Sequence, residues 1–237
     1  MFSTYRLLKK QTTQTKNRIH SLLKERLYGF TREEIFSQAC RVKIRGLESG
    51  TSLSFQIDLL LNQLEQLEAQ IEKLEGMIKE YAAVFMKEIE ILTSMKGISV
   101  FIAAAIIADI EKVDRFKNSK CFTSYLRSAP SVSNSNTSTK NKGTNKKGRK
   151  LSATLLTQSL NHVLSASPKL AKWYDKLTEF KKRGLVRTGL RRRVLAEIYQ
   201  MLKKGEYYYG REAQKYEAKM LQYKRFLKKR NFLFEIA

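Results

Sequence analysis

Cysteine, histidine and proline are scarce in this chain, which has two of each among 237 residues. So few cysteines and histidines, set far apart, exclude a disulfide framework and the ligand spacing of a protein-bound metal. Only Pro130 and Pro168 interrupt the backbone, and no segment alternates apolar and polar residues as a half-buried strand does. We therefore expect an all-α protein built from long helices.

Long apolar runs are also absent. The most apolar segment, residues 100–108, is far shorter than the roughly 18 residues that span a bilayer. The N-terminal residues MFSTYR lack the apolar region of a signal peptide. We expect no membrane partner and a reducing, cytoplasmic location.

Acidic residues are a minority, 22 against 46 lysines and arginines, which gives a net charge of +24. A field of this size attracts polyanions and binds phosphates by releasing their counterions. It exceeds what solubility requires, which argues against a merely solvated surface on a helical bundle. Nucleic acid is the expected partner.

Several helices follow from the pattern of apolar residues. A basic helix is expected over residues 4–28, and a second over 31–48 with Thr31 as its N-cap and Glu34 completing a capping box. A regular stripe then alternates steps of four and three residues, which predicts a coiled-coil seam within one long helix. Its members are Leu60, Leu64, Leu67, Ile71, Leu74, Ile78, Tyr81 and Phe85. Oligomerisation, an intramolecular hairpin and packing on the chain's own domain all stay open.

A glycine turn precedes an Ala-rich helix expected over residues 100–110. A helix, a Gly-Ile turn and a second helix give the outline of a helix-hairpin-helix, whose turn amides bind phosphate. Lys96, Gly97 and Ser99 are the candidate DNA-binding residues of this turn. Any buried Ala-rich helix after a glycine turn has the same outline.

The most informative stretch is LRSAPSVSNSNTSTKNKGTNKKGRKL, residues 126–151. It places candidate hydroxyl nucleophiles beside enough positive charge to hold a phosphodiester backbone. The basic residues are Lys140, Lys142, Lys146, Lys147, Arg149 and Lys150. A second basic patch contains Arg191, Arg192 and Arg193.

The order of these elements resembles the C-terminal half of the DEDD-class insertion-sequence transposases, the family that uses a bridge RNA. The matching segments are TQTKNRIHSLL, MKGISVFIAAAIIADIEKVDRF, YLRSAP, SNSNTSTKNKG, KKGRKLSATLL and VLAEIYQMLKKGEYY, which extend over nearly the whole chain. Two motifs depart from the family pattern. Its P-G-I-G turn is Lys96 to Ser99 here, and its G-L-x-P is Arg127 to Pro130.

The resemblance implies a serine nucleophile that becomes covalently joined to DNA. The family's spacing places it on Ser135, five residues after Pro130 and thirteen before Gly148. Asn136 replaces the glycine that follows the serine in the family. Three further serines compete for the role, namely Ser131, Ser133 and Ser138.

The family also has an RNase H-like domain whose four acidic residues bind divalent metal, and this sequence contains no such cluster. We expect a truncated or split transposase that binds no cofactor itself, with Mg²⁺ implied for the missing domain. A serine hydroxyl needs a base or metal to activate it, so this chain alone is expected to be inactive. A non-catalytic nucleic-acid-binding protein is the alternative.

The resemblance further implies DNA and a bridge-type guide RNA as partners, association with the nucleoid, and a homo-oligomer formed through the coiled coil. The expected fold is a long coiled-coil helix pair projecting from a compact helical domain with a helix-hairpin-helix-like element. The expected divisions are linker helices in 1–52, the coiled-coil helix in 53–91, the serine transposase domain in 92–210 and a basic C-terminal helix in 211–237.

Overall fold

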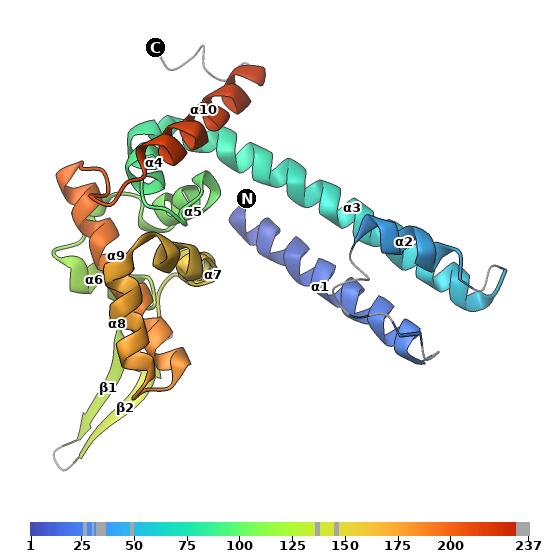
Figure 1. Ribbon diagram of the computed structural model, residues 1–237, viewed down its shortest axis with the longest axis horizontal. Helices are drawn as coiled ribbons and strands as arrows, with labels where there is room; N and C mark the ends of the chain where they lie inside the picture. Colours follow the sequence, from blue (N-terminus) through green and yellow to red (C-terminus); the bar gives the residue numbers. More distant parts are fainter. Residues whose placement is uncertain are drawn as a thin grey trace. The chain divides into compact units, whose positions relative to one another are not determined.

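The computed structural model describes residues 1–25, 28–29, 31, 37–47, 50–135, 138–144 and 147–230, with the backbone alone over 130–144. The chain forms two compact units, 1–78 and 79–237, which divide inside helix α3. Helices dominate both units, which confirms the all-α class (Figure 1). Within the described residues the exception is a two-stranded hairpin in the second unit.

The first unit contains α1 (Phe2–Glu25), α2 (Gln38–Arg45) and most of α3 (Ser52–Tyr81). The helix expected over 31–48 is shorter than predicted, because α2 begins at Gln38. Its N-cap is Ser37, whose hydroxyl accepts a hydrogen bond from the Cys40 amide at 3.2 Å. Thr31 lies outside a helix, and Glu34 lies outside the described residues.

Helices α1 and α3 run antiparallel. Lys9 pairs with Glu75 at 3.9 Å and Lys16 pairs with Glu68 at 3.2 Å, so residue numbers rise along α1 while they fall along α3. Apolar side chains of α1, α2 and α3 form one buried cluster, which consists of Ile19, Leu22, Leu23, Cys40, Ile44, Ile57, Leu61 and Leu64. The N-terminal part of the apolar stripe is therefore covered within the chain.

The predicted seam differs from the buried face at both ends. The buried apolar side chains of α3 are Ile57, Leu61, Leu64, Leu67, Ile71 and Ile78, whereas Tyr81 and Phe85 are exposed. A coiled coil and oligomerisation through it stay predictions.

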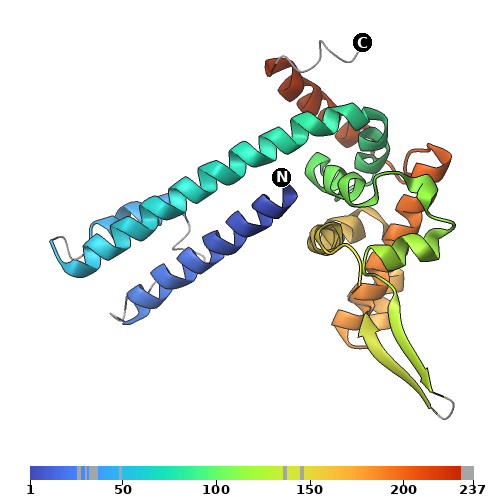
Figure 2. The ribbon, with the colours of Figure 1, turned by 180° about the vertical axis from the view of Figure 1, so that it is seen from behind.

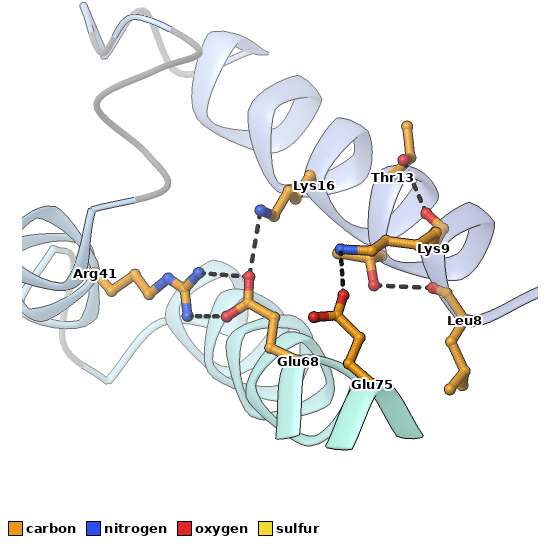
Figure 3. A network of polar contacts seen from close by, with 8 residues as sticks. Leu8, Lys9, Thr13, Lys16, Arg41, Glu68 and Glu75 are labelled. Carbon is orange, nitrogen blue, oxygen red and sulfur yellow. Dashed lines mark hydrogen bonds and ion pairs between the residues drawn. The ribbon is translucent and has the colours of Figure 1, made fainter. Parts of the chain in front are cut away.

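A charged network fixes how the three helices of this unit meet (Figure 3). Glu68 accepts two hydrogen bonds from the Arg41 guanidinium, at 2.8 and 2.9 Å, and pairs with Lys16 from the other side. Burial alone would raise the pKa of Glu68, but the hydrogen bonds from Arg41 and Lys16 outweigh it and hold that pKa below its usual range. Because Arg41 is buried, its charge depends on this one carboxylate.

We expect Glu68→Gln to lower the free energy of unfolding by roughly 1–3 kcal/mol, because it leaves a buried guanidinium without its counter-charge. The folded-state pKa of Glu68 is depressed, so its stabilisation is present above the ordinary carboxyl pKa of about 4.3 and is lost as the pH falls through the lower folded value. Urea unfolding at several pH values measures both effects. Glu65→Gln, which changes the exposed pair with Arg45, is the control. Equal losses in the two variants would contradict a special role for Glu68.

The second unit contains the remaining elements. They are η2 (Ala82–Phe85), α4 (Met86–Thr93), α5 (Val100–Ile110), η3 (Val113–Arg115), α6 (Ser119–Tyr125), β1 (Pro130–Ser135), β2 (Ser138–Thr144), α7 (Leu151–Ala166), α8 (Pro168–Thr178), α9 (Arg183–Lys204) and α10 (Ala213–Lys229). Helix α9 packs against α4, α6, α7 and α8, so it is the central element of the unit. Its fully buried positions include Leu190, Leu195 and Ile198.

The one long helix expected to carry the apolar stripe as far as Phe85 is broken in the structure. Helix α3 ends at Tyr81, and a short 3₁₀ turn leads into α4. Just before the break, the Lys79 carbonyl accepts a hydrogen bond from the Tyr223 hydroxyl of α10, at 2.7 Å. A tertiary contact from α10 thus lies beside the break.

Candidate nucleic-acid interface

The serine-rich stretch is a β-hairpin whose strands extend from the helices of the second unit (Figures 1 and 2). The strands are antiparallel, with Val132 opposite Asn141, Ser133 opposite Lys140 and Ser135 opposite Ser138. Positions that face each other across an antiparallel ladder share a face, and positions alternate along each strand. Positions 133, 135, 138 and 140 therefore lie on one face of the hairpin.

The sequence shows only that the candidate serines and lysines share one stretch of the chain, whereas the strand register shows which of them share a face. Three of the four candidate serines and one predicted phosphate ligand, Lys140, share the face. Ser131 lies at the irregularity between Pro130 and Val132, and Lys142 lies two positions beyond Lys140. The structure describes only the backbone of these residues, and Lys146 lies outside the described residues altogether.

A half-buried arginine braces the first strand where it leaves the helices. Arg191 on α9 donates to the Ser128 hydroxyl at 2.9 Å, to the Thr157 hydroxyl at 2.9 Å and to the Arg127 carbonyl at 2.8 Å. Ser128 is itself buried, and its amide donates to the Thr123 carbonyl at 2.8 Å. Burial lowers the pKa of Arg191. The donors of Arg191 thus serve the base of the hairpin, and its predicted contact with DNA stays a prediction.

After the second strand, the backbone at Gly148 lies very close to the end of helix α6. Gly148 has a φ of +104°, and a Cβ atom added there would lie 2.3 Å from the Tyr125 carbonyl oxygen. The next amide, of Arg149, donates to that same oxygen at 2.9 Å, and Arg127 Nε donates to the Gly148 carbonyl at 2.7 Å. The two ends of the hairpin are thereby tied together.

The carboxylate of Asp109 anchors the helix that follows. Asp109 is buried on α5 and accepts a hydrogen bond from the Ser152 amide at 3.1 Å, in the first turn of α7. An acidic side chain suits this place, because the first amides of a helix have no partner within it. No role was expected of Asp109 from the sequence, although an acid in an otherwise apolar helix was a signal.

Exposed positive charge surrounds the base of the hairpin. Lys147, Arg149 and Lys150 are all exposed immediately after β2. An open groove beside them is lined by Lys120, Cys121, Ser124, Tyr125, Lys147 and Gly148. Lys120 and Tyr125 were not among the predicted binding residues, since α6 shows no basic cluster in sequence.

The second predicted basic patch is split by the helix geometry. Arg192 and Arg193 are exposed on α9, whereas Arg191 turns to the hairpin base. The Arg193 guanidinium lies over the Trp173 ring, 5.1 Å from its centroid. Consecutive helical residues point in directions about 100° apart, which separates neighbouring arginines in this way.

The predicted phosphate-binding turn lies between α4 and α5. Gly97 has a φ of +92°, and a Cβ there would lie 2.9 Å from the Val163 side chain of α7. The Ser99 hydroxyl caps α5 by accepting from the Ile102 amide at 3.2 Å, and Lys96 pairs with Glu212 at 3.0 Å. The structure thus gives each of these three residues a role within the fold, and their binding of DNA stays a prediction.

Within the described ranges, no group of three or more His, Cys, Asp or Glu side chains is placed to hold a metal ion. No helix there combines the length and apolar content that crossing a membrane requires.

The second unit thus presents a serine-rich hairpin that is braced at its base, with exposed cations beside that base. The sequence model of the Transposase IS116/IS110/IS902 family matches residues 89–175, a segment from α4 to α8 that includes the entire hairpin. The match supports an insertion-sequence transposase and implies an interaction with DNA. No curated protein matches the chain.

Proposed function

We propose that this chain carries the serine nucleophile of a DEDD-class, bridge-RNA-type insertion-sequence transposase. The observation that carries the proposal is the hairpin itself. A serine on a loose loop would be a poor nucleophile. Here the base of the serine-rich hairpin is held by Arg191, Gly148 and Arg127. Arg127 and Gly148 lie within the family-matched region, and Arg191 lies on α9, which packs on that region. A hairpin held in this way would present a serine to a phosphate bound at the same face.

In the proposed reaction the Ser135 oxygen bonds to the scissile phosphorus while the bond to a deoxyribose oxygen breaks. One DNA end becomes joined to the protein, and the proton lost by serine is balanced by the one gained by the leaving hydroxyl. Lys140, which belongs to the next pair on the same face of the ladder as Ser135, would hold the scissile phosphate, and the exposed cations at the hairpin base would hold other phosphates of the same DNA. A metal-bearing RNase H-like domain would supply Mg²⁺ to activate the hydroxyl.

Two further partners belong to the proposal. A guide RNA would bind through the same excess of positive charge, since phosphate contacts do not distinguish the two nucleic acids. A homo-oligomer would bring two hairpins to two DNA strands. Both follow from the resemblance to the bridge-RNA transposases.

The test is a covalent adduct. The chain is mixed with the RNase H-like domain of a related transposase, Mg²⁺, guide RNA and end-labelled DNA, and adducts are separated under denaturing conditions. We expect an adduct with the unmodified chain and none with Ser135→Ala. Ser133→Ala and Ser138→Ala, on the same face of the hairpin, are the matched controls and should keep the adduct.

An adduct that survives Ser135→Ala but is lost in another serine variant would identify that other serine as the nucleophile. Adduct formation without the added domain would contradict the need for a separate metal site. No adduct in any mixture would favour the non-catalytic nucleic-acid-binding protein.

Duplex binding should depend on the cations after β2. Neutralising Lys147, Arg149 and Lys150 together should lower the slope of log K against log salt by up to about 0.9 for each phosphate that the protein no longer neutralises. Fluorescence anisotropy of a labelled duplex over a salt series measures the slope. Neutralising three exposed cations of α1, namely Arg6, Lys10 and Lys24, is the matched control. An equal fall in both triple variants would show that binding is spread over the whole charged surface.

A further inference from the structure

Aromatic side chains gather around the segment that connects α9 to α10. Three consecutive tyrosines occupy positions 207–209. Tyr208 is buried, while Tyr209 has 72% of its surface exposed and lies against it, with ring centroids 4.6 Å apart. A large exposed ring held by a buried one is a ready stacking surface.

Cations lie around this ring. A hollow of about 100 Å³ beside Tyr209 is lined by Met95, Lys169, Leu170, Arg193, Val194, Glu197, Tyr208 and Tyr209. Lys169 and Arg193 are both exposed, and Arg193 is held over Trp173. The floor is apolar, through Met95, Leu170 and Val194, and Glu197 adds an acceptor for N–H groups.

We propose that this hollow binds an unpaired nucleotide of a single-stranded nucleic acid. The base would stack on Tyr209, its N–H groups would donate to Glu197, and Lys169 and Arg193 would hold the adjoining phosphates. Base faces are hidden in a duplex and available in a single strand, so an exposed aromatic ring among cations fits the single strand better. This surface is separate from the hairpin, and its proposed ligand does not depend on Ser135.

Phosphate contacts weaken strongly as salt rises and stacking does not, so a salt series separates the two contributions to binding. The full-length chain is titrated against fluorescent oligo(dT), oligo(rU) and a duplex of mixed sequence, over a salt series. We expect Tyr209→Ala to weaken single-strand binding at least about fivefold, at every salt concentration, with little effect on the duplex. Arg193→Gln should lower the single-strand salt slope by about 0.7.

Two substitutions serve as controls. Tyr209→Phe keeps the ring and should bind as the unmodified chain does, and Tyr81→Ala removes another exposed tyrosine and should change nothing. A larger loss for oligo(rU) than for oligo(dT) would identify RNA as the ligand, and the reverse would identify DNA. Unchanged single-strand binding in Tyr209→Ala, or an equal loss for the duplex, would overturn the proposal. The adduct assay tests Ser135 separately, so the two proposals fail independently.

Discussion

Replacing Gly148 by alanine is expected to destabilise the second unit by about 3 kcal/mol or more. The added Cβ would lie 2.3 Å from the Tyr125 carbonyl oxygen, a collision with backbone that no side-chain rotation relieves. The φ of +104° adds the strain of a conformation that favours glycine, about 1–3 kcal/mol. The second strand must then move away from α6, which breaks the hydrogen bonds that join the two ends of the hairpin.

Urea unfolding of the full-length chain measures this effect, and Gly205→Ala is the matched control. Gly205 also has a positive φ, +72°, but a Cβ added there would meet nothing within 4 Å, so the control separates the backbone strain from the collision. We expect the control to lose about 1 kcal/mol. Similar losses in the two variants would show that the approach of Gly148 to Tyr125 contributes little.

Removing the Arg191 guanidinium should produce the second large effect. Arg191→Met keeps an unbranched apolar stem but deletes three hydrogen bonds, and leaves the Arg127 carbonyl and two hydroxyl groups without their donor. The two hydroxyls keep the hydrogen bonds that they donate to backbone carbonyls, so each group loses one partner. A hydrogen bond to a charged group contributes about 1.5–3 kcal/mol, so after relaxation we expect a net loss of roughly 2–4 kcal/mol. Arg191→Lys should not restore stability, because a single ammonium cannot reproduce the planar arrangement of donors.

The neighbouring Arg192 provides the control, since it is exposed on the same helix. Arg192→Met should leave the free energy of unfolding within about 0.5 kcal/mol of the unmodified chain. The salt slope of duplex binding gives a second measurement that a structural role would not change. A lower slope with unchanged stability in Arg191→Met would assign Arg191 to phosphate binding instead of to the hairpin brace.

Much of the helical class follows from local properties of the sequence. Scarce proline and the spacing of Leu64, Leu67 and Ile71 predict helices without knowledge of the fold, because that spacing places side chains on one face of a helix. The charge of +24 likewise predicts a polyanion as partner wherever the residues lie. The order of motifs around Pro130 was enough to suggest an insertion-sequence transposase, which the match over residues 89–175 supports.

The candidate site depended on contacts that the sequence does not reveal. Ser and Asn are weak strand formers, so residues 130–144 gave no sign of a hairpin, and the shared face of Ser135 and Lys140 followed only from their pairing. Arg191 lies 63 residues from Ser128, and Tyr223 lies 144 residues from the Lys79 carbonyl that lies just before the break after α3. Local sequence determined which segments are helices and that the surface is cationic. Tertiary structure decided which cations brace the fold and which face solvent, because a buried hydrogen-bond partner is chosen by packing between distant segments.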